Sequence, residues 1–395
     1  MKLLFSAFTG YNLRELLLPL TPLINQDKNI NEVIVVSPAA PYRDQLFAYL
    51  PAKYRFLTDQ PGVSGYKKLL SDHQPDCVVT PTPGLEEKDI PLLQAARQIG
   101  IPTVTFIASW DNVYKLARRI KIRKYKQQYA VADHFAVWNA MNKKHLLNIV
   151  PRLAPQQITV TGAPRLDFLS DPVKIPSRET LLQRLKIPDD GKKLIHVAST
   201  ELYPSDYIIK AIADRGDCHI LLSVHPGGNI TFHRRYAEPY RAFVRYSFGR
   251  RRHSPVPEFT YNPTLDDLRL HAALFLHSDL LINHSSTVTI ESLLADTPVI
   301  NVKYGKPLDW WRWHRSMVYR DFNQHARIII DSGATAVVHS RRELINAVAA
   351  NLQDPAMHQA ARRALAIKMV TITDGTAGRR LLDLIKNVAD YKGTP

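Results

Sequence analysis

Short apolar runs alternate with helical patterns along most of the chain, and this alternation predicts its architecture. In the first half, apolar residues recur at helical spacing over 14–20, 43–50 and 90–99. Buried strands are predicted at 2–7, 32–37, 55–57, 77–80, 103–108, 134–137 and 158–161. Strands that alternate with helices are typical of a parallel sheet covered on both faces, the doubly wound α/β fold.

The same rhythm restarts after a proline-containing stretch over residues 171–190. Further strands are predicted at 193–198, 218–224, 280–283, 299–302 and 327–330, with helices at 342–351 and 355–367. A chain of 395 residues favours two domains over one. We therefore predict two facing Rossmann-like domains, over 1–175 and 190–370, with a cleft between them. A C-terminal helix within 371–395 would be free to pack back on the first domain.

The stretch from residue 280 to residue 302 is typical of a βαβ unit, with a hydroxyl-rich loop after its first strand. Ser285, Ser286 and Thr287 fall where a helix would begin, so hydroxyls and backbone N–H groups would meet the positive end of its dipole. Such a site suits phosphate. Glu291 lies about one turn further on, within reach of a ribose or sugar hydroxyl. The simpler alternative is that a hydroxyl caps the helix and Glu291 completes a capping box.

Two other predicted strands of the second half also end in polar residues. One stops at His225, which begins a His-Pro-Gly-Gly turn, and another at Ser199 and Thr200. In an open α/β sheet, ligands bind outside the carboxyl ends of the strands. We therefore expect these three residues, with the hydroxyls of 285–287, to bind the nucleotide-linked donor.

Polar residues also follow strands in the first half of the chain. Gly10 would let the backbone approach a ligand closely. After the strand over 103–108 come Trp110, Asp111 and Asn112. Trp110 could stack against a sugar ring, Asp111 could act as a general base, and Asn112 could bind a hydroxyl group. The alternative is that Asp111 or Asn112 only caps the helix that follows.

Two further features each admit more than one interpretation. Arg165 leaves the first domain in a Gly-Ala-Pro-Arg turn and could reach a phosphate, although a contact with Asp167 is an equal alternative. The stretch 310–314, Trp-Trp-Arg-Trp-His, is rich in aromatics and cations. It suits a stacking wall for acceptor sugars, an interfacial membrane anchor or an oligomer contact.

Composition limits the classes of protein that the chain can represent. Its two cysteines, Cys77 and Cys218, lie beside apolar runs, which predicts buried thiols in a reducing compartment. The sequence lacks a Cys/His cluster for zinc, a P-loop, the nucleophile elbow of esterases and an Asp-X-Asp pattern at a strand end. We expect no metal and no cofactor besides the nucleotide-linked substrate.

The formal net charge of +16 points to an anionic partner or surface. Seven Lys and Arg residues lie between Lys115 and Lys126 without an acid among them. Val113, Leu116 and Ile120 recur there at helical spacing, which predicts a basic amphipathic helix resting on an anionic membrane surface. The alternative is that these basic residues only form a solvated surface. Nucleic acid is not an expected partner, because the sequence contains no recognised nucleic-acid-binding motif.

The location follows from the apolar runs. None reaches the length of about 18 residues that spans a membrane, and the first run is interpreted as a strand and not as an export signal. We expect a cytoplasmic protein, with peripheral contact to the inner face of the bacterial cytoplasmic membrane.

Together, these motifs resemble the two-domain GT-B glycosyltransferases, in particular cell-surface polysaccharide enzymes and the CDP-glycerol glycerophosphotransferase family. The resemblance rests on Ser109-Trp110-Asp111-Asn112, Val137-Trp138-Asn139, residues 161–165, His225-Pro226, residues 285–287 with Glu291, and residues 374–380.

The His-Pro and paired-Ser motifs are also similar to those of bacterial sialyltransferases and Kdo transferases, which use CMP-sugars. That resemblance implies that His225 and the 285–287 loop hold the nucleotide phosphates, with Glu291 near the ribose. The sialyltransferases carry an acidic-acidic-Gly motif in the acceptor domain, whereas residues 189–191 lie elsewhere in this chain. Asp111 is therefore nominated as catalytic base by its position.

The leading hypothesis is a metal-independent transferase that moves a sugar from a CMP- or other nucleotide-sugar to a hydroxyl of a surface glycan or lipid-linked acceptor. Gly10, Trp110, Asn112 and Arg165 would contact the acceptor. One alternative is a polyol-phosphate transferase using CDP-glycerol or CDP-ribitol. Further alternatives are a nucleotide-sugar 2-epimerase and a non-catalytic glycan-binding or nucleic-acid-binding module.

Overall fold

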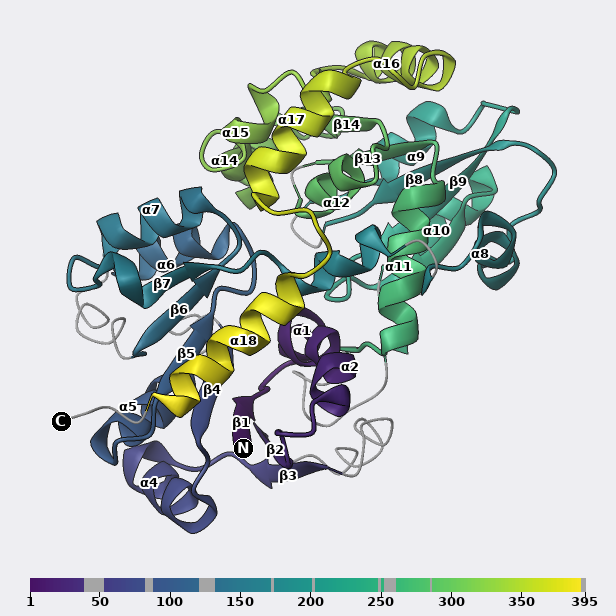
Figure 1. Ribbon diagram of the computed structural model, residues 1–395. Helices are drawn as coiled ribbons and strands as arrows, with labels where there is room; N and C mark the ends of the chain where they lie inside the picture. Colours follow the sequence, from purple (N-terminus) through teal and green to yellow (C-terminus); the bar gives the residue numbers. More distant parts are fainter. Residues whose placement is uncertain are drawn as a thin grey trace. The chain divides into compact units, whose positions relative to one another are not determined.

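The computed structural model describes residues 1–38, 53–81, 88–120, 132–171, 174–200, 203–247, 250–251, 261–284 and 286–391. The chain forms two compact units, each built on a parallel sheet (Figure 1). Unit 1 comprises Met1–Ser170, Arg251–Leu265 and Val370–Pro395, and unit 2 comprises Asp171–Arg250 and Asp266–Met369. The sheets have seven and six strands, which confirms the predicted pair of Rossmann-like α/β domains.

The sheet of unit 1 runs in the order β3-β2-β1-β4-β5-β6-β7. Its strands are β1 (Lys2–Ser6), β2 (Glu32–Ser37), β3 (Tyr54–Thr58), β4 (Cys77–Pro81), β5 (Thr103–Phe106), β6 (His134–Val137) and β7 (Ile158–Val160). All of these strands pair in parallel. The strand order changes direction between β1 and β4.

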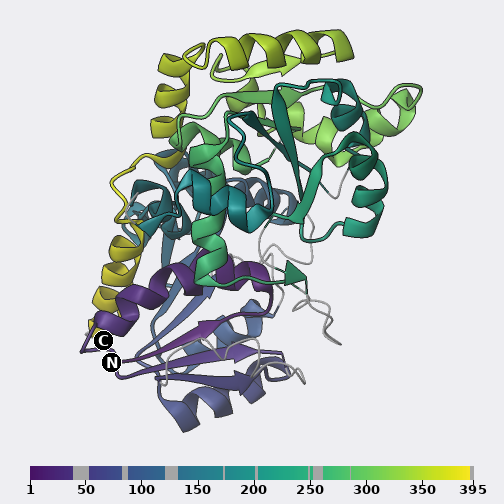
Figure 2. The ribbon, with the colours of Figure 1, turned by 90° about the vertical axis from the view of Figure 1, so that its right-hand side faces the viewer.

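Helices cover both faces of this sheet (Figure 2). They are α1 (Gly10–Asn12), the π-helical stretch Leu13–Leu17, α2 (Leu18–Gln26), α4 (Gly62–His73), α5 (Asp89–Gln98), α6 (Asn112–Ile120), α7 (Ala140–Ile149), α18 (Ala377–Asp390) and the 3₁₀ turns Pro155–Gln157 and Pro164–Ser170. On one face, Leu4 and Val78 pack with Leu70 of α4 in a buried cluster. Each such side chain contributes about 1.5–3 kcal/mol through its removal from water.

The last helix, α18, is part of unit 1, where it packs against α2 and β4 (Figure 1). The Asp167 carboxylate accepts hydrogen bonds from the N–H groups of Ala377 (3.0 Å) and Gly378 (2.7 Å) at the start of the helix. Arg380 Nε donates to the Thr161 carbonyl at 2.9 Å. Asp167 is therefore engaged by α18 and not by Arg165, so the alternative contact considered from the sequence does not form.

The sheet of unit 2 runs in the order β10-β9-β8-β13-β14-β15. Its strands are β8 (Lys193–Ala198), β9 (Cys218–Val224), β10 (Phe243–Tyr246), β13 (Leu280–Asn283), β14 (Val299–Val302) and β15 (Ala336–Val338). All pair in parallel. Counted in chain order this is 3-2-1-4-5-6, the order of a Rossmann sheet.

One predicted strand of unit 2 is wrong. Residues 327–330 form helix α15 (Arg327–Ile330), and the edge strand is β15, which the sequence analysis missed. The three isoleucines of this segment favour a strand by propensity, but Ile329 is buried together with Ala326, three residues earlier. Packing at helical spacing therefore overrides the β-propensity of the run.

The helices of unit 2 also cover both faces of its sheet. They are α8 (Arg178–Leu185), α9 (Asp206–Ile212), α10 (Ile230–Ala237), the 3₁₀ turn Glu238–Tyr240, α11 (Leu265–His277), α12 (Val288–Leu294), α13 (Trp310–Arg315), α14 (Met317–Phe322), α15, α16 (Arg341–Gln353) and α17 (Gln359–Val370). Leu194 of β8 packs with Leu274 of α11 on one face. Val197 packs with Ile208 of α9 on the other. The short strands β11 (Arg250–Arg251) and β12 (Tyr261–Asn262) form a separate sheet.

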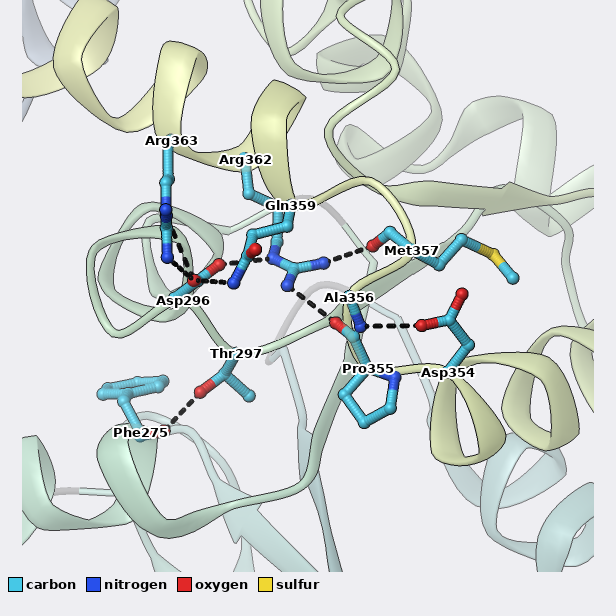
Figure 3. Close-up of polar contacts among 10 residues, drawn as sticks. All are labelled: Phe275, Asp296, Thr297, Asp354, Pro355, Ala356, Met357, Gln359, Arg362 and Arg363. Carbon is cyan, nitrogen blue, oxygen red and sulfur yellow. Dashed lines mark hydrogen bonds and ion pairs between the residues drawn. The ribbon is translucent and has the colours of Figure 1, made fainter.

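A cluster of charged side chains fastens α17 to the turn between α12 and β14 (Figure 3). Asp296 in this turn accepts hydrogen bonds from Arg362 Nε (3.1 Å), Gln359 Nε2 (2.6 Å) and Arg363 Nη2 (3.1 Å). Arg362 is 1% exposed and also donates to the carbonyl of Pro355 at 2.8 Å. Because a buried guanidinium needs its partners, this cluster constrains both segments.

We predict that Arg362→Met destabilises the protein, whereas Arg363→Met does not. The first change leaves the Pro355 carbonyl and Asp296 without the buried donor, which should lower the free energy of unfolding by about 3 kcal/mol. The second removes an exposed partner of the same carboxylate and should cost less than about 1 kcal/mol. Urea unfolding followed by circular dichroism measures both, and equal losses would contradict the assignment.

Candidate functional site

The carboxyl ends of the strands in unit 2 bring several candidate residues to one edge of the sheet. β8 and β13 are neighbours in the sheet although they are not consecutive in the chain. At such a switch point the flanking loops diverge, and ligands of open α/β sheets bind there. Ser199 and Thr200 follow β8, and residues 284–287 follow β13. His225 follows β9, the strand beside β8.

The register of the strands brings these loops to the same level. Ser223, Ala198, Asn283 and Asn301 are cross-strand partners in a single row. Neighbouring strands lie about 4.8 Å apart, so the row from Ser223 through Ala198 to Asn283 spans about 10 Å, and His225, Ser199 and His284 follow these positions in the chain. The structure thus brings the imidazole of His225 and the loop after β13 to one edge. Ser285 lies outside the described residues.

The His225 turn is fixed by its own hydrogen bonds. Ser199 Oγ accepts from the His225 N–H at 3.0 Å, and His225 Nδ1 accepts from the Gly227 N–H at 3.1 Å. A neutral imidazole that accepts at Nδ1 carries its proton on Nε2, which makes Nε2 a donor. A Cβ on Gly228 would lie 3.0 Å from Val224 Cγ1 and 3.1 Å from the His225 carbonyl oxygen. A side chain at this position would therefore press against the turn.

A buried network of amides supports the loop after β13. Asn301 Nδ2 donates to the His284 carbonyl at 2.7 Å and to Asn283 Oδ1 at 3.2 Å. Asn283 Nδ2 donates to Thr289 Oγ1 of α12 at 3.1 Å. The sequence analysis missed these residues. The sequence did contain a signal for them, since Asn283 and Asn301 each lie in an otherwise apolar predicted strand. Buried polar groups need hydrogen-bond partners, so such residues indicate a buried network.

His284 is a buried member of the wall beneath this loop. Its Nε2 lies 2.8 Å from the hydroxyl of Tyr207, which in turn donates to the Tyr304 carbonyl at 2.6 Å. His284 Nε2–H is therefore the donor to Tyr207. Burial lowers the pKa of His284 to about 3, so the ring is neutral near pH 7. His284 was not among the residues predicted from the sequence. Its neutral state results from burial, which the residues next to it in the chain do not indicate.

The helix after this loop begins later than predicted. α12 begins at Val288, and Thr287 makes no capping hydrogen bond through its side chain. The capping-box alternative is therefore wrong for Thr287 and Glu291. Glu291 is 3% exposed, and its Oε2 lies 3.4 Å from His271 Nε2 of α11. Its proposed contact with a ribose stays a prediction, as do the roles of Ser286, Thr200 and Thr287.

The candidate residues of unit 1 differ in their exposure. Gly10 is buried in the first turn of α1, where Thr9 makes the N-cap. Trp110 is 4% exposed and lies edge-on to Tyr114, so its ring offers no open face for a sugar. The expected stacking platform is therefore corrected to a packing role. Asn112 is half-buried and begins α6.

Asp111 immediately precedes α6. Its Oδ1 accepts from Ser109 Oγ at 2.6 Å, and its Oδ2 lies 2.7 Å from Lys115 Nζ. The Asp111 side chain is 14% exposed. The carboxylate that the sequence nominates as base thus lies after β5, beside an ammonium group.

Arg165 lies within unit 1. Its Nε is 2.6 Å from Glu15 Oε2, and both side chains are almost fully buried. The guanidinium carbon of Arg165 lies 5.4 Å from the centroid of the Trp138 ring. Because Glu15 would lose this partner if Arg165 moved to a ligand, the expected contact with a phosphate has no support in this placement.

The basic helix predicted for a membrane surface is described up to Ile120, and residues 121–131 lie outside the described residues. Val113 and Leu116 are 0% exposed and belong to a core cluster of unit 1, against which Ile120 also packs. Lys115 pairs with Asp111. The apolar stripe of α6 therefore faces the protein core, and contact of the basic residues with an anionic membrane surface stays a prediction.

A cavity of about 910 Å³ lies at the opposite edge of the unit 1 sheet, near the amino ends of β4 to β6. Asp76 and Asp133 line it, and both accept hydrogen bonds from backbone N–H groups, of Lys2 and Thr103 respectively.

Among the described residues, no group of three or more His, Cys, Asp or Glu side chains could hold a metal ion. Within the same residues, no helix has the length and apolarity needed to cross a bilayer.

Comparison with known proteins gives a clear result only for solved structures, since no family model and no curated protein matches the chain. The UDP-GlcNAc 2-epimerase of Neisseria meningitidis bound to UDP-GlcNAc matches with TM-score 0.65 and 15% identity, over 98% of this chain and 100% of that chain. The S. aureus MnaA–UDP structure matches with TM-score 0.63 and 16% identity, over 98% and 97%. The wall teichoic acid polymerase TagF with CDPG matches with TM-score 0.62 and 15% identity, over 99% and 89%.

These likenesses show the fold. The chain shares the GT-B-like, two-domain architecture of these proteins along nearly its whole length. The fold expected from the resemblance to GT-B glycosyltransferases is therefore confirmed. Which of their reactions it performs is a separate question.

We predict that stability falls in acid because His284 is held neutral. The unfolded side chain has a pKa near 6.5 and the folded one a pKa of about 3. Below pH 6.5 the unfolded state therefore binds a proton that the folded state does not, and this contribution to stability is lost at about 1.4 kcal/mol per pH unit. His284→Gln keeps a donor for Tyr207 and removes the titration.

Urea unfolding at pH 7 and at pH 5 tests this. The stability lost by the wild type on acidification should exceed that lost by His284→Gln by about 2 kcal/mol. The exposed His339 gives the control variant His339→Gln, which should follow the wild type. Equal losses in all three proteins would show that His284 is not held neutral by the fold.

Proposed function

We propose that this protein is an enzyme that acts on a nucleoside diphosphate sugar and that unit 2 binds the diphosphate. The observation that carries the proposal is the meeting of Ser199, His225 and the loop after β13 where the strand order changes direction. The fold is also that of proteins whose solved structures hold UDP, UDP-GlcNAc or CDPG.

The groups at this edge suit a phosphate chemically. Thr200 and Ser286 supply hydroxyls, and the His225 ring supplies an N–H donor at Nε2 whose tautomer is fixed by the Gly227 N–H. Hydrogen bonds to an ionised phosphate are among the stronger ones in proteins. We propose that these donors take the place of a metal ion, so treatment with a chelator should leave activity unchanged.

Of the reactions considered, we favour epimerisation at C2 of the sugar. The support is the end-to-end match to a UDP-GlcNAc 2-epimerase, which covers 98% of this chain and 100% of that chain. C2 of the sugar has no neighbouring carbonyl, so a base that removes its proton must act as the nucleoside diphosphate leaves C1, which forms a C1=C2 double bond. The diphosphate oxygen then adds back to C1 while a protein group returns a proton to the opposite face of C2. Asp111, with Lys115 beside it, is our candidate for the base.

Transfer to an acceptor is the second candidate. The match to the teichoic acid polymerase TagF favours it, and so does the net charge of +16, which suits an anionic acceptor. The product would carry a sugar, or a polyol phosphate, on a surface glycan or lipid-linked hydroxyl. An epimerase has no need of such an acceptor.

We predict that the protein binds UDP or CDP and that His225→Ala weakens this binding by about tenfold or more, because it removes a hydrogen bond to a charged phosphate. Thermal shift with UDP, CDP, CMP and GDP identifies the nucleotide, since a ligand of the folded state raises the melting temperature. Titration calorimetry then gives the dissociation constants. His339→Ala, after β15 at the same edge of the sheet, is the matched control.

Without bound nucleotide, His225→Ala and His339→Ala should melt close to the melting temperature of the wild type, because His225 is half-buried and His339 is exposed. If His225→Ala binds the nucleotide as tightly as His339→Ala does, the diphosphate site is misplaced. If no nucleotide shifts the melting temperature of the wild type, the enzyme proposal itself fails.

We predict that UDP-GlcNAc incubated with the protein in deuterated water, without an acceptor, gains deuterium at C2 and forms its 2-epimer. Asp111→Asn should abolish both changes, because an amide cannot take the proton. NMR follows the two signals directly, and Asp72→Asn, at an exposed carboxylate of α4, is the control. A donor that stays unchanged until a glycan acceptor is added would replace the epimerase with the transferase.

A further inference from the structure

The loop after β14, helix α13 and the first residue of α14 carry four exposed large apolar side chains, which together we call the α13 surface. Leu308 is 107% exposed, Trp310 66%, Trp311 64% and Met317 45%. We propose that the α13 surface docks this protein onto an anionic phospholipid membrane. The proposal rests on exposure and charge and is independent of the proposed function.

The helix that carries the two tryptophans is fixed from within. Trp313 of the same helix is 4% exposed and belongs to the main core cluster of unit 2. A Cβ on Gly305 would lie 2.5 Å from Trp313 Cβ, so the preceding loop is packed directly on this ring. The indoles of Trp310 and Trp311 are therefore held outward by a well-packed helix, with ring centroids 6.1 Å apart.

The backbone of Leu308 adopts a left-handed conformation, which is strained for leucine. Its φ is +63°, in the left-handed region that favours glycine or asparagine, within a turn closed by the Asp309 N–H and the Lys306 carbonyl at 3.1 Å. A glycine would relieve the backbone, and a polar side chain would suit water better. A strained and fully exposed leucine is accounted for if its side chain enters an apolar phase.

The charge of the surface matches an anionic bilayer. Between Lys303 and Arg320 the chain carries five Lys or Arg residues and one acid, Asp309. Two of the five are paired with carboxylates, Lys306 with Asp206 and Arg320 with Asp321. Asp309 accepts from the Tyr203 hydroxyl at 3.3 Å. Within the part of the chain that the structure describes, no carboxylate forms an ion pair with Arg312 or Arg315.

Tryptophan and arginine together are typical of the membrane interface, where an indole lies at the headgroups and cations face phosphate. Arg315 is already stacked with Trp311, its guanidinium carbon 5.5 Å from the ring centroid. An indole and a guanidinium on one short helix can thus enter the interface together.

Two other occupants fit the surface less well. Sugar hydroxyls need acceptors as well as stacking faces, whereas the exposed charged side chains of α13, Arg312 and Arg315, are donors, and Leu308 and Met317 are purely apolar. A second copy of the chain, docked through the same surface by twofold symmetry, would place its cations against Arg312 and Arg315. A phosphate-rich bilayer satisfies both the apolar and the basic groups.

Vesicle binding tests the proposal with the full chain. We expect sedimentation with vesicles of phosphatidylglycerol and phosphatidylcholine in equal parts, weakened by high salt, and none with phosphatidylcholine alone. Brominated lipid should quench tryptophan fluorescence, a readout specific to this surface because Trp110, Trp138 and Trp313 are buried.

Leu308→Gly is the decisive variant. It relieves the backbone at φ +63°, so the melting temperature should be unchanged or higher, while vesicle binding falls by about tenfold. Replacing Trp310 and Trp311 by serine should abolish both binding and quenching. Phe232→Ser, at another apolar residue of unit 2 with 52% exposure, is the matched control and should bind like the wild type.

Three results would overturn the proposal. The first is failure of the wild type to bind the anionic vesicles. The second is undiminished binding by the Leu308 and tryptophan variants, which would assign membrane contact to another basic segment. The third is a concentration-dependent dimer on gel filtration that Leu308→Gly dissolves, which would make the α13 surface a contact between copies.

Discussion

The edge of the unit 2 sheet depends on the hydrogen bonds of one buried amide. Asn301 Nδ2 donates at 2.7 Å to the carbonyl of His284, the first residue after β13, and so fixes the direction in which the chain leaves the sheet. Asn283, in the same row, repeats this arrangement toward α12 through Thr289. Since these amides are buried, an unsatisfied member would cost more than its hydrogen bond contributes. The loop after β13 is thereby held in place by side chains of the neighbouring strands.

Much of the architecture could be predicted from local patterns. Strands that contain several consecutive apolar residues, such as Cys77-Val78-Val79 and Leu280-Leu281-Ile282, can be predicted because both of their faces are covered. The prediction failed at 327–330, where three isoleucines suggest a strand and the neighbouring core selects a helical turn. It also missed β10 and β15, edge strands of only four and three residues, which are too short for a periodic pattern to be recognised.

The candidate site shows where sequence reasoning stops. That Ser199, His225 and the loop after β13 share an edge could be anticipated, because strand ends follow from the strands themselves. The burial of Trp110 and the pairing of Arg165 with Glu15 could not, since they depend on contacts between segments far apart in the chain. The same holds for His284, whose neutral state is set by the wall around it.

The return of the chain to unit 1 after α17 has a consequence for how the protein forms. Leu381, Leu382 and Ile385 of α18 are almost completely buried, yet the strands of that domain precede them by more than two hundred positions. During synthesis, unit 2 is therefore fully translated while its neighbour still lacks a covering helix. The earlier-made domain must wait, with apolar area open to solvent or to a chaperone, until α18 leaves the ribosome.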